Sequence, residues 1–161
     1  MPPTSIASQP PALDTLGQSM QAFSRLVAQG RILEVVLKRA RIKLTRAELS
    51  LLYSLRGAGD GIRLGYLADT LVIDAPTVTR RVQHLEARGL VRRAPDPIDR
   101  RAQLVHLTAA GERIIERGMA AFRRWLEGVL TDWSGSERDQ LAELLQRFTT
   151  DIYADLECNG H

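Results

Sequence analysis

The sequence has little of what several protein classes require. Cys158 is its one cysteine, so no internal disulfide can form and stability does not depend on oxidation. No apolar run approaches the roughly 18 residues of a membrane span. The N-terminus lacks the basic and then apolar pattern of a secretory signal. We therefore expect a cytoplasmic protein without a membrane partner.

The usual motifs of catalysis are also missing. The sequence has no phosphate-cradling glycine loop, no H-E-x-x-H and no C-x-x-C. Its three histidines, His84, His106 and His161, are scattered along the chain and suggest no metal cluster or catalytic triad. We expect no enzyme activity, no catalytic residue, no metal and no cofactor.

Lysine is scarce, and arginine takes its place. The chain has 161 residues, 44% of them apolar and 25% charged, which is ordinary for one globular domain. Lys38 and Lys43 are the only lysines among 22 basic residues, and the net charge is +3. Residues 75–108 carry +4 and residues 109–161 carry −4. A local basic stretch is typical of phosphate binding, but charge alone leaves an Arg-rich solvated face as an equal alternative.

The N-terminal part predicts an arm and then a helix. Residues 1–12 are rich in proline and serine and lack periodicity, so we expect a flexible arm. An apolar stripe follows at steps of three and four, and the helix is expected to continue to about Lys38. The stripe consists of Leu13, Leu16, Met20, Phe23 and Val27.

The middle of the chain predicts two short helices joined by a tight turn. A capping box of Thr45 and Glu48 opens the preceding helix, and a glycine-rich stretch ends it. A short helix is expected at 66–71. Asp74 is a favourable N-cap for a second helix that runs to Arg88. Together these two helices predict a helix-turn-helix.

A hairpin is predicted directly after this motif. Residues 90–93 and 103–107 have the pattern of strands, and the prolines and aspartates of 94–102 favour a turn between them. A helix-turn-helix followed by such a hairpin is a winged helix.

Two long helices are expected at the C-terminal end. Thr108 is predicted to cap a helix reaching Trp133, and Ser136 is predicted to cap the last one. The apolar face of the last helix has little to pack on within one small domain. The predicted fold is therefore mainly α with a small β-wing: a winged helix-turn-helix with N- and C-terminal dimerisation helices.

The helix at 75–88 has an outward face suited to DNA. Val78, Val82 and Leu85 face inward, while arginines and threonines face outward. Arginine can hold guanine by two hydrogen bonds, and threonine can contact a base edge or a thymine methyl. An ordinary amphipathic helix is the alternative, and the wing that follows favours DNA. The candidate DNA-binding residues are Thr77, Thr79, Arg80, Arg81 and His84.

The predicted wing adds further candidates. A hairpin tip bearing Arg100 and Arg101 fits the narrow, electronegative minor groove. Asp99 would repel DNA unless it braces the Arg101 guanidinium, so a bracing role is expected. A solvated turn is the alternative.

These motifs resemble the MarR family of bacterial transcription regulators. The resemblance is carried by T-V-T-R-R at 77–81, D-P-I-D-R-R-A at 96–102 and L-T-A-A-G at 107–111, and it covers about residues 14–157. It implies a homodimer that binds a pseudo-palindromic operator in double-stranded DNA. It also implies repression that a small phenolic or aromatic effector relieves in many members.

The resemblance also implies a domain organisation. A MarR-type domain is expected at 13–157, followed by a tail at 158–161. Within it, the winged helix covers about 41–108, and the dimerisation helices cover about 13–40 and 109–157.

An effector pocket is expected between the dimerisation helices and the winged helix. Tyr53, Arg56 and Tyr66 are the polar-tipped side chains expected nearest to it, although a purely structural role is favoured for each one taken singly. The alternative function is an architectural protein that coats DNA without sequence preference.

Overall fold

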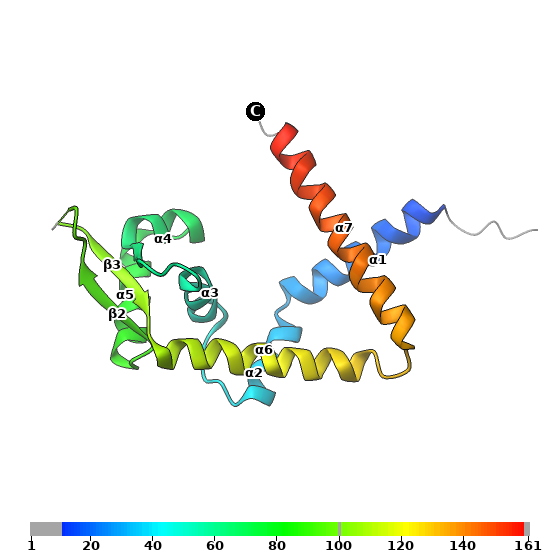
Figure 1. Ribbon diagram of the computed structural model, residues 1–161, viewed down its shortest axis with the longest axis horizontal. Helices are drawn as coiled ribbons and strands as arrows, with labels where there is room; N and C mark the ends of the chain where they lie inside the picture. The colour runs from blue at the N-terminus through cyan, green and yellow to red at the C-terminus, as the bar shows by residue number, and fades with distance from the viewer. Residues whose placement is uncertain (1–10, 100, 160–161) are drawn as a thin grey trace, which may run out of the picture. The chain divides into compact units, whose positions relative to one another are not determined.

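The computed structural model describes residues 11–99 and 101–159 (Figure 1). The chain divides into two compact units, Met1–Ala121 and Phe122–His161. In chain order the elements are α1 (Ala12–Ala28), α2 (Arg31–Ala40), α3 (Arg46–Leu55), β1 (Ile62–Arg63), α4 (Leu64–Leu71), α5 (Ala75–Ala87), β2 (Val91–Pro95), β3 (Gln103–Leu107), α6 (Ala109–Val129) and α7 (Gly135–Asn159).

The single helix expected from residue 13 to Lys38 is wrong, because the chain forms two helices there. Gly30 lies between α1 and α2 with φ 71°, a left-handed conformation that glycine adopts without steric cost. The apolar spacing continues across this break and therefore conceals it. The guanidinium of Arg46, at the start of α3, donates to the carbonyl of Ala28 at 3.2 Å and so occupies an end carbonyl of α1.

The predicted helix-turn-helix is confirmed. The capping box that opens α3 is complete, since the Glu48 N–H donates to the Thr45 hydroxyl and the Thr45 N–H donates to the Glu48 carboxylate. Val72, with φ 52°, ends α4. Asp74 then caps α5 by accepting from the Thr77 N–H at 2.9 Å.

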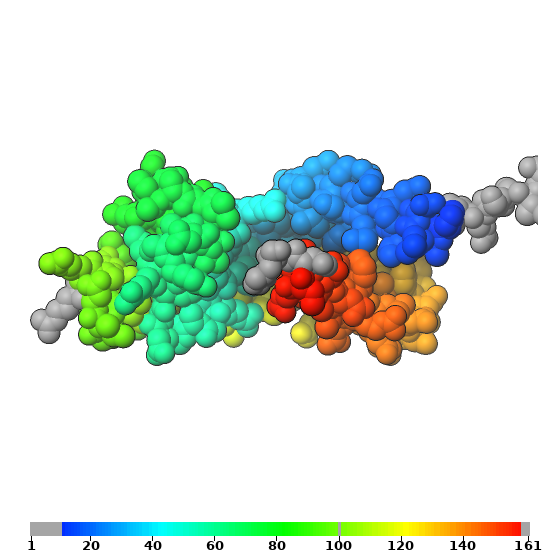
Figure 2. Space-filling model, turned by 90° about the horizontal axis from the view of Figure 1, so that it is seen from above, coloured from blue at the N-terminus to red at the C-terminus, as the bar shows by residue number. Residues whose placement is uncertain are grey.

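Three antiparallel strands form the wing and its base, in the order β1-β3-β2. Ile62 of β1 pairs with Val105 of β3, and Val91 of β2 pairs with Leu107 of β3. In the space-filling view the wing (yellow-green) lies beside α4 and α5 (green) (Figure 2). The winged helix expected from the hairpin pattern is therefore present.

The core of the first unit is built from branched aliphatic side chains. Fully buried residues come from α3, α4, α5, the sheet and α6, and truncation of such a leucine typically costs about 2–5 kcal/mol. Gly111 brings α6 against the base of the wing, where an added Cβ would lie 2.2 Å from the carbonyl oxygen of Leu90. The largest buried residues are Leu51, Leu52, Leu55, Leu67, Leu85, Ile115, Val78, Val82, Val91 and Val105.

The second unit contains the end of α6 and all of α7. Ser134, not the predicted Ser136, caps α7, because its hydroxyl and N–H share the carboxylate of Glu137 in a second capping box. Within the described residues, no helix is long and apolar enough to span a bilayer. Large apolar side chains of α7 are exposed, namely Leu144, Leu145, Ile152, Tyr153 and Leu156.

Candidate nucleic-acid interface

Helix α5 turns one face to the core and the other outward, as its pattern predicts. Val78, Val82 and Leu85 are fully buried and fix the rotation of the helix. On the outer face, four of the sequence-predicted residues come together around a hollow of about 440 Å³. These four are Thr77, Arg80, Arg81 and His84. The hydroxyl of the fifth, Thr79, donates to the carbonyl of Ala75 at 2.8 Å, one turn back along α5.

Arg81 lines this hollow and also has an unsatisfied donor. One of its Nη atoms is buried and has no hydrogen-bond partner within the part of the chain that the structure describes. Buried N–H groups in folded proteins almost always have a partner. An arginine guanidinium can donate to a phosphate oxygen or a guanine edge, both of which only accept at the contact.

His84 is anchored to α3 by a residue that the sequence did not identify as functional. Its Nδ1 lies 2.7 Å from Oε1 of Glu48, whose side chain is 7% exposed. The other oxygen of Glu48 serves the capping box with Thr45, and Arg88 lies 4.0 Å from Oε1. One buried carboxylate thus links the start of α3 to the outer face of α5.

The pKa of Glu48 is lowered, because the hydrogen bonds to its carboxylate have a larger effect than its burial. Burial acts to raise the pKa of Glu48, but the bonds from the Thr45 N–H and hydroxyl and the charge and hydrogen bond of His84 lower it below the usual 4.5. Glu48 is therefore ionised at neutral pH and can hold His84 and Arg88. The capping-box motif predicts the hydrogen bond between Glu48 and Thr45 from the sequence. The contact of Glu48 with α5 depends on tertiary packing and has no local sequence signal.

Asp99 does not make the contact expected in the wing. Its Oδ1 accepts from the backbone N–H of Arg101 at 3.0 Å, and the structure shows no contact between Asp99 and the Arg101 guanidinium. Two residues apart in a turn, a short carboxylate reaches the main chain more easily than the end of a long side chain. Arg101 is exposed, and Arg100 lies outside the described residues.

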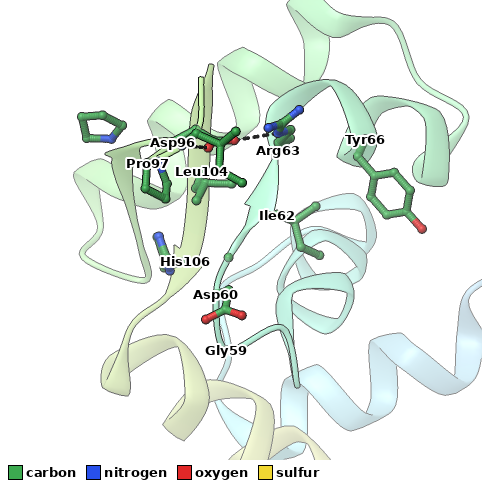
Figure 3. A pocket seen from close by; sticks show the side chains of 12 residues that line it. Gly59, Asp60, Ile62, Arg63, Tyr66, Asp96, Pro97, Leu104 and His106 are labelled. Carbon is green, nitrogen blue, oxygen red and sulfur yellow. Dashed lines mark hydrogen bonds and ion pairs between the residues drawn. The ribbon is translucent and has the colours of Figure 1, made fainter. Parts of the chain in front are cut away.

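Asp96, one of the aspartates expected to favour the wing turn, orders it, although its contact with β1 (Figure 3) was not predicted from the sequence. It is 3% exposed, and its Oδ1 accepts from the N–H groups of Ile98 at 2.8 Å and Asp99 at 3.2 Å. Its Oδ2 accepts from Nε of Arg63 in β1 at 2.6 Å. The bond from the Ile98 N–H is the main cause that holds the pKa of Asp96 below its usual value.

A further ion pair connects the wing to α5. The guanidinium of Arg93 in β2 lies 2.7 Å from Glu86, whose other oxygen accepts from the Arg93 N–H at 3.1 Å. The Arg93 hydrogen bond is the main cause that lowers the pKa of Glu86. The wing is thus tied both to α5 and, through Asp96, to β1.

Of the three residues expected near an effector pocket, Tyr53 and Arg56 reach α6, whereas Tyr66 lies next to the wing. Arg56 pairs with Glu112 of α6 at 3.2 Å and contacts the sulfur of Met119. Tyr53 is partly exposed, and its hydroxyl faces Gly118 of α6. Tyr66 lines a different groove, next to the wing. Among the described residues, no group of His, Cys, Asp and Glu side chains is placed to hold a metal ion.

Comparison with known proteins gives the same fold and identifies a family. The sequence profile of the MarR family matches residues 42–102. The HTH-type transcriptional regulator YdgJ of Bacillus subtilis is 35% identical over 104 residues, which cover 65% of this chain and 61% of YdgJ. The chain spans about three-fifths of the length of the first curated relatives it matches.

Solved structures extend the similarity over most of the chain. The transcriptional regulator Tm0710 of Thermotoga maritima has a TM-score of 0.69 and 26% identity, and the match covers 85% of this chain and 98% of Tm0710. MarR itself has a TM-score of 0.58 and 26% identity, and the match covers 89% of this chain and 99% of MarR. The chain belongs to the MarR family of winged-helix transcriptional regulators.

Proposed function

We propose that this protein is a sequence-specific DNA-binding regulator whose α5 enters the major groove of double-stranded DNA. The outer face of α5 carries this proposal, because Thr77, Arg80, Arg81 and His84 converge there around one hollow. The N-terminal part of a recognition helix contacts base edges. The Asp74 carboxylate accepts from the Thr77 N–H, so its negative charge is directed toward the helix. This orientation supports the approach of DNA to the N-terminus of α5.

In the proposed complex the wing contacts the minor groove. Arg101 is exposed at the tip of the wing, and Arg100 belongs to the same D-P-I-D-R-R-A motif. Asp99 orders the main chain beside Arg101, and Asp96 holds the turn on which both residues lie. A hairpin fixed at its base places an arginine with little loss of conformational entropy on binding.

The protein is proposed to act as a homodimer. The large apolar side chains of α1 and α7 are exposed, which is costly in water and typical of a surface that a second copy covers. The segments 13–40 and 109–157 would then form the dimer, and 41–108 the winged helix. Two such units fit a pseudo-palindromic operator, and we propose that its occupation represses transcription in the cytoplasm until a small aromatic effector binds.

The proposed function is tested by identifying the bound sites. Genomic footprinting of the full chain should return a pseudo-palindrome with half-sites about one helical turn apart, 10–10.5 bp. Equal occupation of unrelated sequences would refute sequence-specific regulation and support an architectural role. A steep decrease of affinity with salt is expected in either case, because phosphate contacts release counterions.

A further inference from the structure

The contact between Glu48 and His84 is a hydrogen bond with a defined direction. Oε1 of Glu48 lies 2.7 Å from Nδ1 of His84, and Glu48 is ionised at neutral pH because its pKa is lowered. An ionised carboxylate only accepts hydrogen bonds. Nδ1 of His84 therefore carries a proton and donates it to Glu48.

The other contacts of Glu48 hold its carboxylate in this orientation. Its side chain is 7% exposed, and Oε2 accepts from the Thr45 N–H at 2.7 Å and from the Thr45 hydroxyl at 2.9 Å. Because Oε2 serves the two donors of Thr45, Oε1 is the oxygen left for the imidazole of His84. The start of α3 thus fixes which nitrogen of a side chain on α5 is protonated.

This bond determines what the second ring nitrogen of His84 can do. A neutral imidazole has one N–H group and one acceptor nitrogen, and the hydrogen bond at one nitrogen selects the tautomer. With the proton on Nδ1, Nε2 of neutral His84 is an acceptor. The His84 side chain is 62% exposed, and Nε2 has no hydrogen-bond partner within residues 11–99 and 101–159.

The hollow on α5 therefore combines donors with an acceptor. Arg80 and Arg81 line it together with His84, and a guanidinium only donates. Arginine is suited to guanine, whose N7 and O6 accept in the major groove. An acceptor nitrogen beside these arginines is suited to the opposite kind of group on a base edge.

We propose that Glu48 is a positioning residue that makes His84 a hydrogen-bond acceptor for a base amino group in the major groove. The amino groups exposed there are N6 of adenine and N4 of cytosine. A phosphate oxygen only accepts, so it cannot pair with Nε2 of the neutral imidazole. His84 thus contributes to sequence selection, an assignment that rests on the proposed entry of α5 into the major groove.

The substitution Glu48→Gln should reverse the character of His84. The glutamine oxygen is expected to stay with the two donors of Thr45, which turns the NH₂ group toward Nδ1 of His84. Two N–H groups would then face each other, and the imidazole avoids this by carrying its proton on Nε2 instead. Nε2 becomes a donor and can no longer accept from an amino group.

The tautomer is measured on the full chain without DNA. Long-range 15N–1H NMR spectra at about pH 8, where histidine side chains are mostly neutral, distinguish a protonated ring nitrogen from an unprotonated one. His84 should carry its proton on Nδ1 in the wild type and on Nε2 in Glu48→Gln. A wild-type proton on Nε2, or the same tautomer in both proteins, would overturn the role of Glu48.

Two controls accompany this measurement. His106 lies in β3, outside the contacts of Glu48, and its ring signals should be the same in both proteins. Glu116→Gln makes the same chemical change at an exposed residue of α6 and should leave the tautomer of His84 unchanged. A change of the His84 tautomer in Glu116→Gln would contradict a specific effect of Glu48.

The base contact is located with operators that lack a single amino group. Purine in place of adenine removes the N6 amino group, and 2-pyrimidinone in place of cytosine removes the N4 amino group. At one base pair of each half-site this removal should weaken wild-type binding about tenfold, but it should not weaken binding of His84→Ala further. The comparison of the two proteins cancels the effect of the analogue on the duplex itself.

An acceptor on guanine provides the matched control. Replacing guanine by 7-deazaguanine removes N7, and its effect should be equal in the wild type and in His84→Ala. Coupling of His84 to N7, or to none of the amino groups, would overturn the proposal. His84 is exposed, so the test with His84→Ala does not depend on the stability of Glu48→Gln.

The operator analogues also separate the role of Glu48 from a loss of stability. A less stable protein binds every operator more weakly by the same factor, whereas Glu48→Gln should lose the dependence on that one amino group. A dependence that persists in Glu48→Gln would overturn the positioning role. Equal binding of the unmodified operator and a shuffled duplex by the wild type would instead refute the proposed function, and operator-specific binding without coupling to His84 would overturn only this proposal.

Discussion

The substitution Glu48→Gln isolates the link between α3 and the outer face of α5. The side chain of Glu48 is 7% exposed, and its oxygens lie 2.7 Å from the Thr45 nitrogen, 2.9 Å from the Thr45 hydroxyl and 2.7 Å from Nδ1 of His84. Glutamine keeps the size of the side chain and one oxygen acceptor. It loses the charge, and its NH₂ group must face a donor.

The expected loss of stability follows from these contacts. A hydrogen bond to a charged group contributes about 1.5–3 kcal/mol and one between neutral groups about 1 kcal/mol. The three contacts share one carboxylate and are not additive. We therefore expect Glu48→Gln to lower the free energy of unfolding by about 1–3 kcal/mol at neutral pH.

The loss should depend on pH in a defined direction. The pKa of Glu48 is lowered in the folded chain, so its ionised form contributes stability above the unfolded value of about 4.5, and this contribution is lost as pH falls through the folded pKa. Urea unfolding followed by circular dichroism should show a large difference between wild type and Glu48→Gln at about pH 7 and a smaller one at about pH 3.5.

The control is Glu116→Gln on α6, an exposed residue with the same chemical change. Its free energy of unfolding should stay within about 0.5 kcal/mol of the wild type. A Glu48→Gln protein as stable as this control, or a difference that does not shrink in acid, would refute the role assigned to Glu48.

Three further substitutions test the interface and the packing of the wing. Arg101→Ala should weaken operator binding more than about tenfold in the gel-filtered protein, and unchanged affinity would disprove the wing contact. Arg81→Ala should cost about 1–3 kcal/mol of operator binding and relax specificity, whereas an equal loss on random duplex would indicate a phosphate contact. Gly111→Ala should destabilise the fold by about 1–3 kcal/mol in urea unfolding, because its Cβ would lie 2.2 Å from the Leu90 carbonyl oxygen, and an unchanged midpoint would contradict that packing.

Local signals in the sequence predicted much of the fold. The capping residues Thr45 and Asp74, the inward face with Val82 and the hairpin after Gly89 each act over a few residues, so their outcome hardly depends on the rest of the chain. The break at Gly30 was missed because the apolar spacing runs through it and a single glycine is tolerated within many helices.

The contacts across the candidate site were harder to predict. His84 and Glu48 are 36 residues apart, and so distant a pairing has no periodic signal. The same holds for Arg63 and Asp96, which meet because β1 pairs with β3 at the edge of the sheet. At the cap of α7, Ser134 and Ser136 both precede a carboxylate by three residues, and the capping box with Glu137 decided between them.

The ratio of operator affinity to random-duplex affinity is the most direct test of the central claim. Fluorescence anisotropy with a labelled footprinted operator, competed by unlabelled operator or shuffled duplex at physiological salt, measures this ratio on the intact protein. Recognition by α5 and the wing predicts a preference of about 10³ or more for the operator. A ratio near one would contradict sequence-specific recognition by this surface.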